Sequence, residues 1–547
     1  MSIQRKLGTI AALGGSTAAL AMLTGIAGAR ADDLQINQQA LNTRIDQLAA
    51  VGQQPGAGAV FSVDQNPATG AAVSAGSFPR SILIPGTDTS IKIYGQITEI
   101  VDYWMSGGTP NGSPQSTTVG DTGQLQSIPL RGTVGSTRGN GIFQTSPRES
   151  KIGFETRTPT PFGEARTVME FDWAGSTAFA PGSSDPTSVS DSLVPRLRYA
   201  YGTLGGFLAG QATSNFSDPD ANGETLDFGG NVGEPGHVRI PQIRYTMPAW
   251  WGASFSVSAE TPDTTIATPA GIEASDAGVV PTVTTTCPTG ATGSVSTATA
   301  STCTTALLTS GVTPLNIAKS SAPDLTAAWY FPQQWGHIDL SGVLRPGIDA
   351  TDGRFFDHQF IGYGGHLGFD IKPGWLGWVK DDIIFHFVAG DTIGPYLNSS
   401  TNFDIATNYG ASSTSAATGT YGGVNGPTTA ASASLIRFKP TQEMGAEIGY
   451  QHWWADNLRS NINGGFLSHY GIPISLVNAT GPGTVAAASG GQAAAINKEL
   501  ISAHANLIWN PVSSVDIGLE YVWGQRTVLN NQTATENVLI SKLAFRF

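Results

Sequence analysis

The carboxy-terminal segment constrains the fold most. Residues 537–547 place Leu539, Leu543, Phe545 and Phe547 on one face of an extended strand and charged side chains on the other. A strand with one apolar and one charged face suits a closed barrel whose outer surface meets lipid and whose inner surface meets water. The edge strand of a soluble sheet could carry the same pattern, so this segment alone leaves both architectures open.

Residues 1–31 have the pattern of a secretory signal. Arg5 and Lys6 precede a run of apolar and small residues, and Ala29-Arg30-Ala31 forms a cleavage site. Without this segment the chain holds 25 basic and 41 acidic side chains, a net charge of −16, which argues against nucleic acid as a partner. No later stretch reaches the roughly 18 apolar residues of a spanning helix, so any membrane span must be made of strands.

The two cysteines, Cys287 and Cys303, enclose fifteen residues that are mostly Pro, Thr, Gly, Ser and Ala. In an exported chain with no other thiol, this spacing predicts one disulfide that staples a surface loop. The alternative is a metal pair, but no His or Asp lies between the two cysteines. We therefore expect neither a metal nor a cofactor.

A short helix is predicted over residues 32–50, where Leu34, Leu41 and Leu48 fall seven apart. About two heptads are too short to be stable alone, but three copies could associate on the axis of an oligomer. A frayed helical tail is the alternative. Residues 51–86 are rich in Gly, Ala, Pro, Gln and Ser and are predicted to be a flexible linker before a barrel domain at 87–547.

Segments of about ten residues with a period of two recur after Ser90, and they predict a sixteen-stranded antiparallel transmembrane β-barrel. An even number of strands of this size leaves an aqueous lumen. The predicted strands are 90–104, 149–158, 164–174, 195–204, 206–212, 240–248, 252–260, 322–332, 336–346, 358–371, 382–390, 434–453, 458–470, 499–509, 514–525 and 536–547.

The connections between these strands alternate in length. Short ones contain Pro and Trp, as in Pro248-Ala-Trp-Trp-Gly252, and read as periplasmic turns with an aromatic girdle. Long ones, such as 213–239 and 261–321, are rich in small polar residues and would be extracellular. A soluble sandwich has no reason to sort its loops by length, so the alternation favours an outer-membrane barrel in a Gram-negative bacterium.

Six runs recur in order along the chain: Pro85–Lys92, Phe207–Gln211, Ser214–Asp220, Pro241–Tyr245, Tyr450–Trp454 and Leu458–Ser460. Together they resemble the DcaP-like family of outer-membrane porins. The resemblance implies a homotrimeric channel associated with dicarboxylate uptake, in contact with outer-membrane lipid. It also implies that the terminal aromatic residues Phe545 and Phe547 are read by the barrel assembly machinery. The long loop that holds both cysteines departs from the family pattern.

A porin carries out no bond chemistry, so its candidate site is the set of charged residues that face the lumen. The loop 213–239 follows the fifth strand, where trimeric porins fold a loop inward, and its acidic residues are expected to face a basic wall. Such a pair of surfaces would favour small anionic solutes. The predicted acidic residues are Asp218, Asp220, Glu224 and Asp227, and the predicted basic ones are Arg166, Arg196, Arg198, Arg244, Arg437 and Lys439.

Three alternatives stay open at this stage. Glu170 and Asp172 should lie across from Arg196 and Arg198, and such pairs could only neutralise each other and keep the wall rigid. The barrel could be an adhesive surface protein that binds through its long Thr/Ser-rich loops. It could also be a hydrolase, although Ser468-His469 places its two side chains on opposite faces of a strand, which spoils a nucleophile–base pair.

Overall fold

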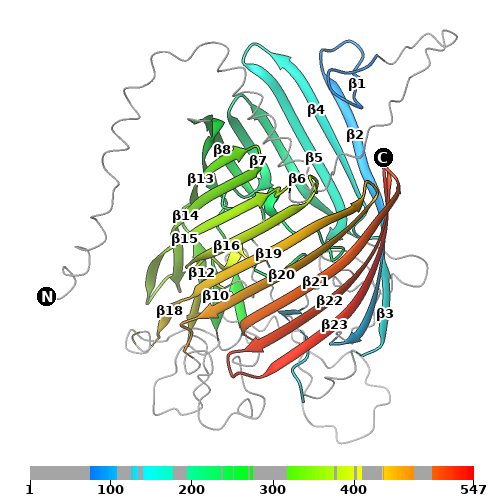
Figure 1. Ribbon diagram of the computed structural model, residues 1–547. Coiled ribbons are helices and arrows are strands. Elements are labelled where there is room, and N and C mark those ends of the chain that lie inside the picture. The colour runs from blue at the N-terminus through cyan, green and yellow to red at the C-terminus, as the bar shows by residue number, and fades with distance from the viewer. Residues whose placement is uncertain are drawn as a thin grey trace, which may run out of the picture.

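The computed structural model is a closed β-barrel (Figure 1). Long strands form its wall. None of the helices in the described residues has the length and apolar character needed to cross a membrane. The described residues are 74–107, 125–126, 128–132, 140–175, 194–233, 235, 238–249, 252–268, 271–274, 317–374, 378–398, 403–408, 434, 436–473 and 496–547.

Sixteen strands of the described residues make the barrel wall, which confirms the predicted number. Each pairs antiparallel with its neighbour, and β2 pairs with β23 to close the ring, with Gln96 opposite Arg546. The wall strands are β2 (Ser90–Ser106), β4 (Lys151–Thr160), β5 (Gly163–Gly175), β6 (Val194–Leu204), β7 (Phe207–Thr213), β8 (Arg239–Pro248), β9 (Ser254–Glu260), β13 (Asp324–Gln333), β14 (Gly336–Thr351), β15 (Asp357–Ile371), β16 (Asp382–Asp391), β19 (Gln442–Ala455), β20 (Leu458–Tyr470), β21 (Asn497–Val512), β22 (Val515–Val528) and β23 (Thr533–Arg546).

The shorter strands either pair with β2 or β14 of the wall or form a separate small sheet. β1 (Ile82–Leu83) and β3 (Ile142–Ser146) pair with β2, and β12 (Ala318–Ser320) pairs with β14. A separate four-stranded sheet contains β10 (Thr265–Thr268), β11 (Gly271–Ala274), β17 (Ile405–Thr407) and β18 (Phe438–Pro440).

The predicted start of one strand is wrong. The sequence predicts a single strand over 434–453, but residues 438–440 form β18 in the small sheet, and the barrel strand β19 begins only at Gln442. Pro440 has no N–H to donate to a ladder, and Thr441 instead donates its N–H to the carbonyl of Asp404 at 2.9 Å. The chain therefore leaves one sheet and enters the other at this point.

The loops are sorted by end, but less strictly than predicted. Tight turns at 161–162, 205–206, 334–335, 456–457 and 513–514 lie at the end of the barrel where the chain terminates. The opposite end carries the long connections, yet the hairpins at 352–356 and 529–532 there are also short. A turn of ten residues, 372–381, lies at the first end.

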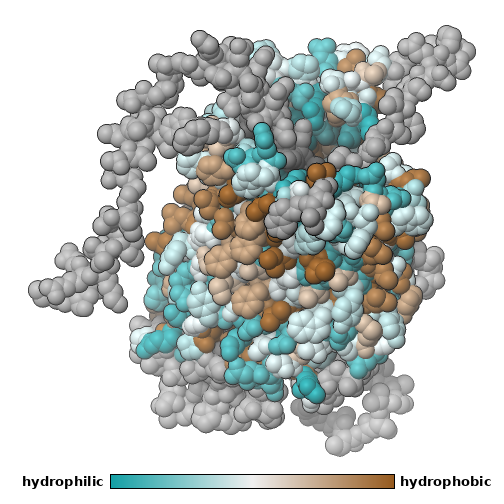
Figure 2. Space-filling model, viewed as in Figure 1, coloured by the Kyte–Doolittle hydropathy of each residue, from teal (hydrophilic) through white to brown (hydrophobic). Residues whose placement is uncertain are grey.

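The outer surface of the barrel is apolar, because side chains alternate between the two faces of each strand. Ile448, Ile462 and Leu519 are more than half exposed on neighbouring parts of the wall, and apolar residues gather over its middle (Figure 2). So many exposed large hydrophobic side chains indicate contact with lipid.

The lumen is partly filled by loops. A buried apolar cluster joins three of them to the wall: Leu125 and Ile128 come from the first long connection, Phe216 from the loop after β7, and Tyr396 from the loop after β16. The last of these loops contains the short 3-10 helix Gly394–Tyr396. This buried apolar cluster therefore lies inside the barrel, between the loops and the wall.

Candidate constriction site

The loop of residues 214–238, here called the inward loop, leaves β7 and enters the lumen. The Ser214 hydroxyl donates to one Glu260 carboxylate oxygen at 2.7 Å, and the Asn215 N–H donates to the other at 2.8 Å. The Asn215 side-chain amide also donates to Thr326 at 3.0 Å. Phe216 is fully buried and meets the Tyr396 ring edge-on, with 5.4 Å between centroids. The start of the loop is thus fixed to β9 and β13.

The middle of the inward loop continues across β14, β16 and β19. Asp218 contacts His337 at 2.7 Å, and Asn222 contacts His386 at 3.0 Å. The Gly223 N–H donates to the Glu447 carboxylate at 3.0 Å. Burial opposes ionisation of Asp218, but the neighbouring His337 outweighs it and lowers the pKa of Asp218 to about 2. Asp218 is therefore paired with His337 of the barrel wall.

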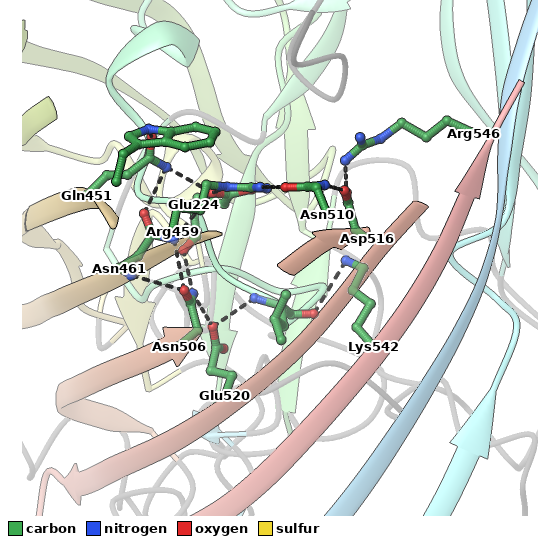
Figure 3. Close-up of polar contacts among 12 residues, drawn as sticks. Glu224, Gln451, Arg459, Asn461, Asn506, Asn510, Asp516, Glu520, Lys542 and Arg546 are labelled. Carbon is green, nitrogen blue, oxygen red and sulfur yellow. Dashed lines mark hydrogen bonds and ion pairs between the residues drawn. The ribbon is translucent and has the colours of Figure 1, made fainter. Parts of the chain in front are cut away.

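Glu224 binds several side chains of the barrel wall (Figure 3). Its carboxylate accepts from Arg459 Nε at 2.7 Å and Arg459 Nη2 at 2.5 Å, and from the side-chain amides of Gln451 at 2.9 Å and Asn461 at 3.2 Å. Its carbonyl accepts from Asn463 and Asn506. A bidentate arginine pair of this kind is among the stronger polar interactions in proteins.

The network continues past the ion pair toward the end of the barrel where the chain terminates. Arg459 also donates to Asn510, which contacts Asp516, and Asp516 pairs with Arg546 on the last strand. Figure 3 shows these side chains in a row that begins at Glu224. One loop carboxylate is therefore tied to four wall strands, β20 to β23.

The tip of the inward loop reaches the opposite part of the wall. The N–H groups of Leu226 and Asp227 donate to the Glu520 carboxylate on β22 at 2.8 and 3.2 Å. The next residue, Phe228, lies beside Arg196 of β6 and Arg148, with 5.2 and 5.5 Å from each guanidinium carbon to the ring centroid. The loop thus extends from β22 to β6.

The wall formed by β4 to β8, here called the basic wall, carries the predicted arginines as ion pairs. Arg196 binds Asp172 at 2.6 Å, and Arg198 binds Glu170 at 2.7 Å and Asp172 at 3.0 Å. The cross-strand pairing that the sequence left open as an alternative is therefore present. Of the two arginines, Arg196 is the more accessible, with 40% of its side chain exposed.

Two further predicted arginines are buried in the same wall. Arg166 donates to Glu155 at 2.8 Å. Arg244 donates to Gln242 at 2.8 Å and to the carbonyl of Thr213, where the inward loop begins. Arg244 thus helps to hold the base of the loop.

Other predicted site residues lie elsewhere. Arg437 and Lys439 are exposed in and beside β18, in the small sheet, so they are not on the barrel wall as the strand prediction required. Asp220 and Asp227 stay on the inward loop, but the loop acids do not form a row that faces the basic wall, since Glu224 and Asp218 bind the opposite side. The predicted disulfide Cys287–Cys303, the helix 32–50 and most of the linker 51–86 lie outside the described residues.

Charge is divided between the two sides of the barrel. The five strands of the basic wall carry seven basic and four acidic residues, a net charge of +3. The six strands β9, β13, β14, β15, β16 and β19, here called the acidic wall, carry ten acidic residues and one arginine, a net charge of −9. The resulting electric field runs across the lumen.

Sequence reasoning missed several partners of the loop. Arg459 alternates inward on β20, and that signal was available, but only the fold brings it to Glu224. Nothing in the sequence pairs Phe228 with two arginines. In the loop after β16, Asp404 binds the buried Arg345, and no local sequence pattern indicates that contact. Among the described residues, no group of three or more His, Cys, Asp or Glu side chains is placed to hold a metal ion.

A closed barrel with an apolar outside, a charged lumen and a loop folded across that lumen defines a membrane channel of the porin class. The family model described as Porin subfamily matches residues 82–452. The chain belongs to this porin family, so it is an outer-membrane channel of a Gram-negative bacterium and not an enzyme. No curated protein matches the chain.

Several solved structures are similar to the chain. The outer membrane channel DcaP of Acinetobacter baumannii is 19% identical, with a TM-score of 0.55 over 87% of this chain and 100% of that one. OmpT of Vibrio cholerae is 8% identical, with a TM-score of 0.41 over 85% and 100%. An anion-selective porin from Comamonas acidovorans is 7% identical, with a TM-score of 0.42 over 84% and 100%. The likeness to DcaP confirms the predicted family fold.

Proposed function

We propose that the protein is a passive diffusion channel that favours small anionic solutes, such as dicarboxylates. The observation that carries this proposal is the division of charge between the basic wall and the acidic wall. The inward loop packs against the acidic wall and donates to its carboxylates: Glu447 accepts from Gly223 N at 3.0 Å and from Asn231 Nδ2 at 2.6 Å. The loop thereby covers Glu447, which is only 2% exposed. A solute in the passage therefore meets the excess of positive charge on the basic wall.

The net charge of −16 does not oppose this proposal, because a solute responds to charges close to its path. Charges more than about 10 Å away are largely screened at physiological salt. The acidic extracellular loops therefore matter less than Arg196, whose guanidinium stays accessible beside Asp172.

The test is the reversal potential of the purified channel in a planar bilayer with a salt gradient. The wild type should favour anions, and the double variant Arg196→Gln with Arg198→Gln should shift the potential toward cations, because the net charge of the basic wall falls from +3 to +1. The matched control is Arg354→Gln, since Arg354 lies exposed in the hairpin 352–356. Cation preference in the wild type, with no response to the double variant, would mean that the ion pairs only neutralise each other.

We also propose that the channel is a homotrimer. Glu99 faces outward on β2, opposite the outward Leu543 of β23, and is exposed. A carboxylate on the lipid face is unfavourable, whereas a neighbouring copy could shield it. Glu99→Arg should therefore lower the temperature at which the oligomer dissociates in mild detergent. The control is Glu499→Arg, near the start of β21, which should leave this temperature unchanged. A monomeric wild type in native mass analysis would refute the trimer.

A further inference from the structure

Phe228 lies at the tip of the inward loop, beside the basic wall. The residues just before it are fixed to β22 and β23, where Leu226 N and Asp227 N bind Glu520 and the Leu226 carbonyl accepts from Lys542 at 3.5 Å. Its ring contacts Arg196 on β6. On the wall, β23 and β6 are separated by β2, β4 and β5, so the contact is made across the lumen.

The ring of Phe228 lies against two guanidinium groups. The carbon atoms of Arg196 and Arg148 lie 5.2 and 5.5 Å from the ring centroid, within the range of a cation–π interaction. Arg196 is fixed from the other side, since its Nε and Nη2 atoms donate to Asp172 at 3.0 and 2.6 Å. The ring therefore rests on a rigid part of the basic wall, while Phe228 itself is only half-buried.

We propose that Phe228 is a specificity-determining residue, which sets the width of the passage between the inward loop and the basic wall. The inference rests on the proposed function, because it places the limiting width beside the arginines that attract anions. The ring acts in two ways. Its volume narrows the passage, and its contact with both guanidinium groups keeps the loop tip in place.

Two substitutions separate these effects. Phe228→Ala removes both the volume and the cation–π contact, so single-channel conductance should rise roughly twofold or more, because conduction through a pore follows its narrowest section. Phe228→Leu keeps most of the volume and loses the aromatic face, so mean conductance should stay near that of the wild type while current noise increases. Phe228→Tyr keeps both properties and is the matched control.

The measurements are single-channel conductance, open-channel noise and reversal potential in planar bilayers, with heat-modifiable gel migration to show that each barrel is folded. Wild-type conductance in a folded Phe228→Ala channel would overturn the assignment of width. Unchanged noise in Phe228→Leu would overturn the tethering role, and this variant also tests the proposal if the alanine form fails to assemble. A cation-preferring wild type whose conductance rises in Phe228→Ala would refute the proposed anion preference and keep the role of Phe228.

Discussion

Replacing Glu224 with Gln should release the inward loop from the wall. The change is isosteric, but it removes the charge that binds Arg459, whose side chain is only 1% exposed. Breaking a buried ion pair by removal of one partner costs about 3–5 kcal/mol. Because Glu224 is 28% exposed and Asn510 also accepts from Arg459, we expect a loss of about 3 kcal/mol in the free energy that holds the loop closed.

Hydrogen exchange of the loop amides measures this loss directly. The N–H groups of Leu226 and Asp227 are bonded to Glu520 only when the loop is docked. A change of about 3 kcal/mol corresponds to a rise of roughly 150-fold in the population of the open loop. The exchange rate rises by the same factor when the loop recloses faster than an exposed amide exchanges. In planar bilayers, the same variant should show additional conductance levels.

The control is Glu164→Gln, which removes a carboxylate from an exposed pair. Glu164 is 41% exposed and lies 3.4 Å from Arg157, so its loss should change stability by less than about 0.5 kcal/mol. In the double variant Glu224→Gln with Arg459→Met, the free energy that holds the loop closed should fall by less than the sum of the two single losses. The reason is that the buried charge is removed together with its partner. Loop amides that exchange at the wild-type rate in Glu224→Gln would refute the anchoring role of this ion pair.

Three further outcomes are expected. Deleting Phe547 should block barrel assembly while export continues, because its N–H and carbonyl bond to Gly95 at 3.1 and 3.3 Å where β23 meets β2; a normal surface yield would contradict this. Non-reducing gels with thiol alkylation should show Cys287 joined to Cys303 within one chain, and loss of the bond should leave conductance unchanged; a thiol that alkylates without reduction would count against the pairing. Removing residues 32–50 should leave a trimer in native mass analysis, since the barrel walls supply most of the contact; a monomeric product would show that the helix is needed for association.

The sequence alone determined the architecture of the wall. Side chains on a strand alternate between two faces, so apolar positions such as Leu539 and Leu543 separate from Lys542 and Arg546 in any strand pairing. That period of two, with turn residues between the segments, was enough to predict sixteen strands and most of their bounds. Its largest failure is at Pro440, which divides one predicted strand between two sheets. Several other bounds differ by a few residues, as in β14, which ends at Thr351 and not at residue 346.

The tertiary structure alone decided what the lumen contains. A loop without periodicity has no local rule that fixes its partners, so the sequence could not show that Glu224 binds Arg459 and that Phe228 bridges Arg148 and Arg196. These pairs are separated by tens to hundreds of residues and meet only because the closed barrel holds both in one small volume. Alternation determines which side chains point inward, whereas the path of the loop determines which of them a solute can reach.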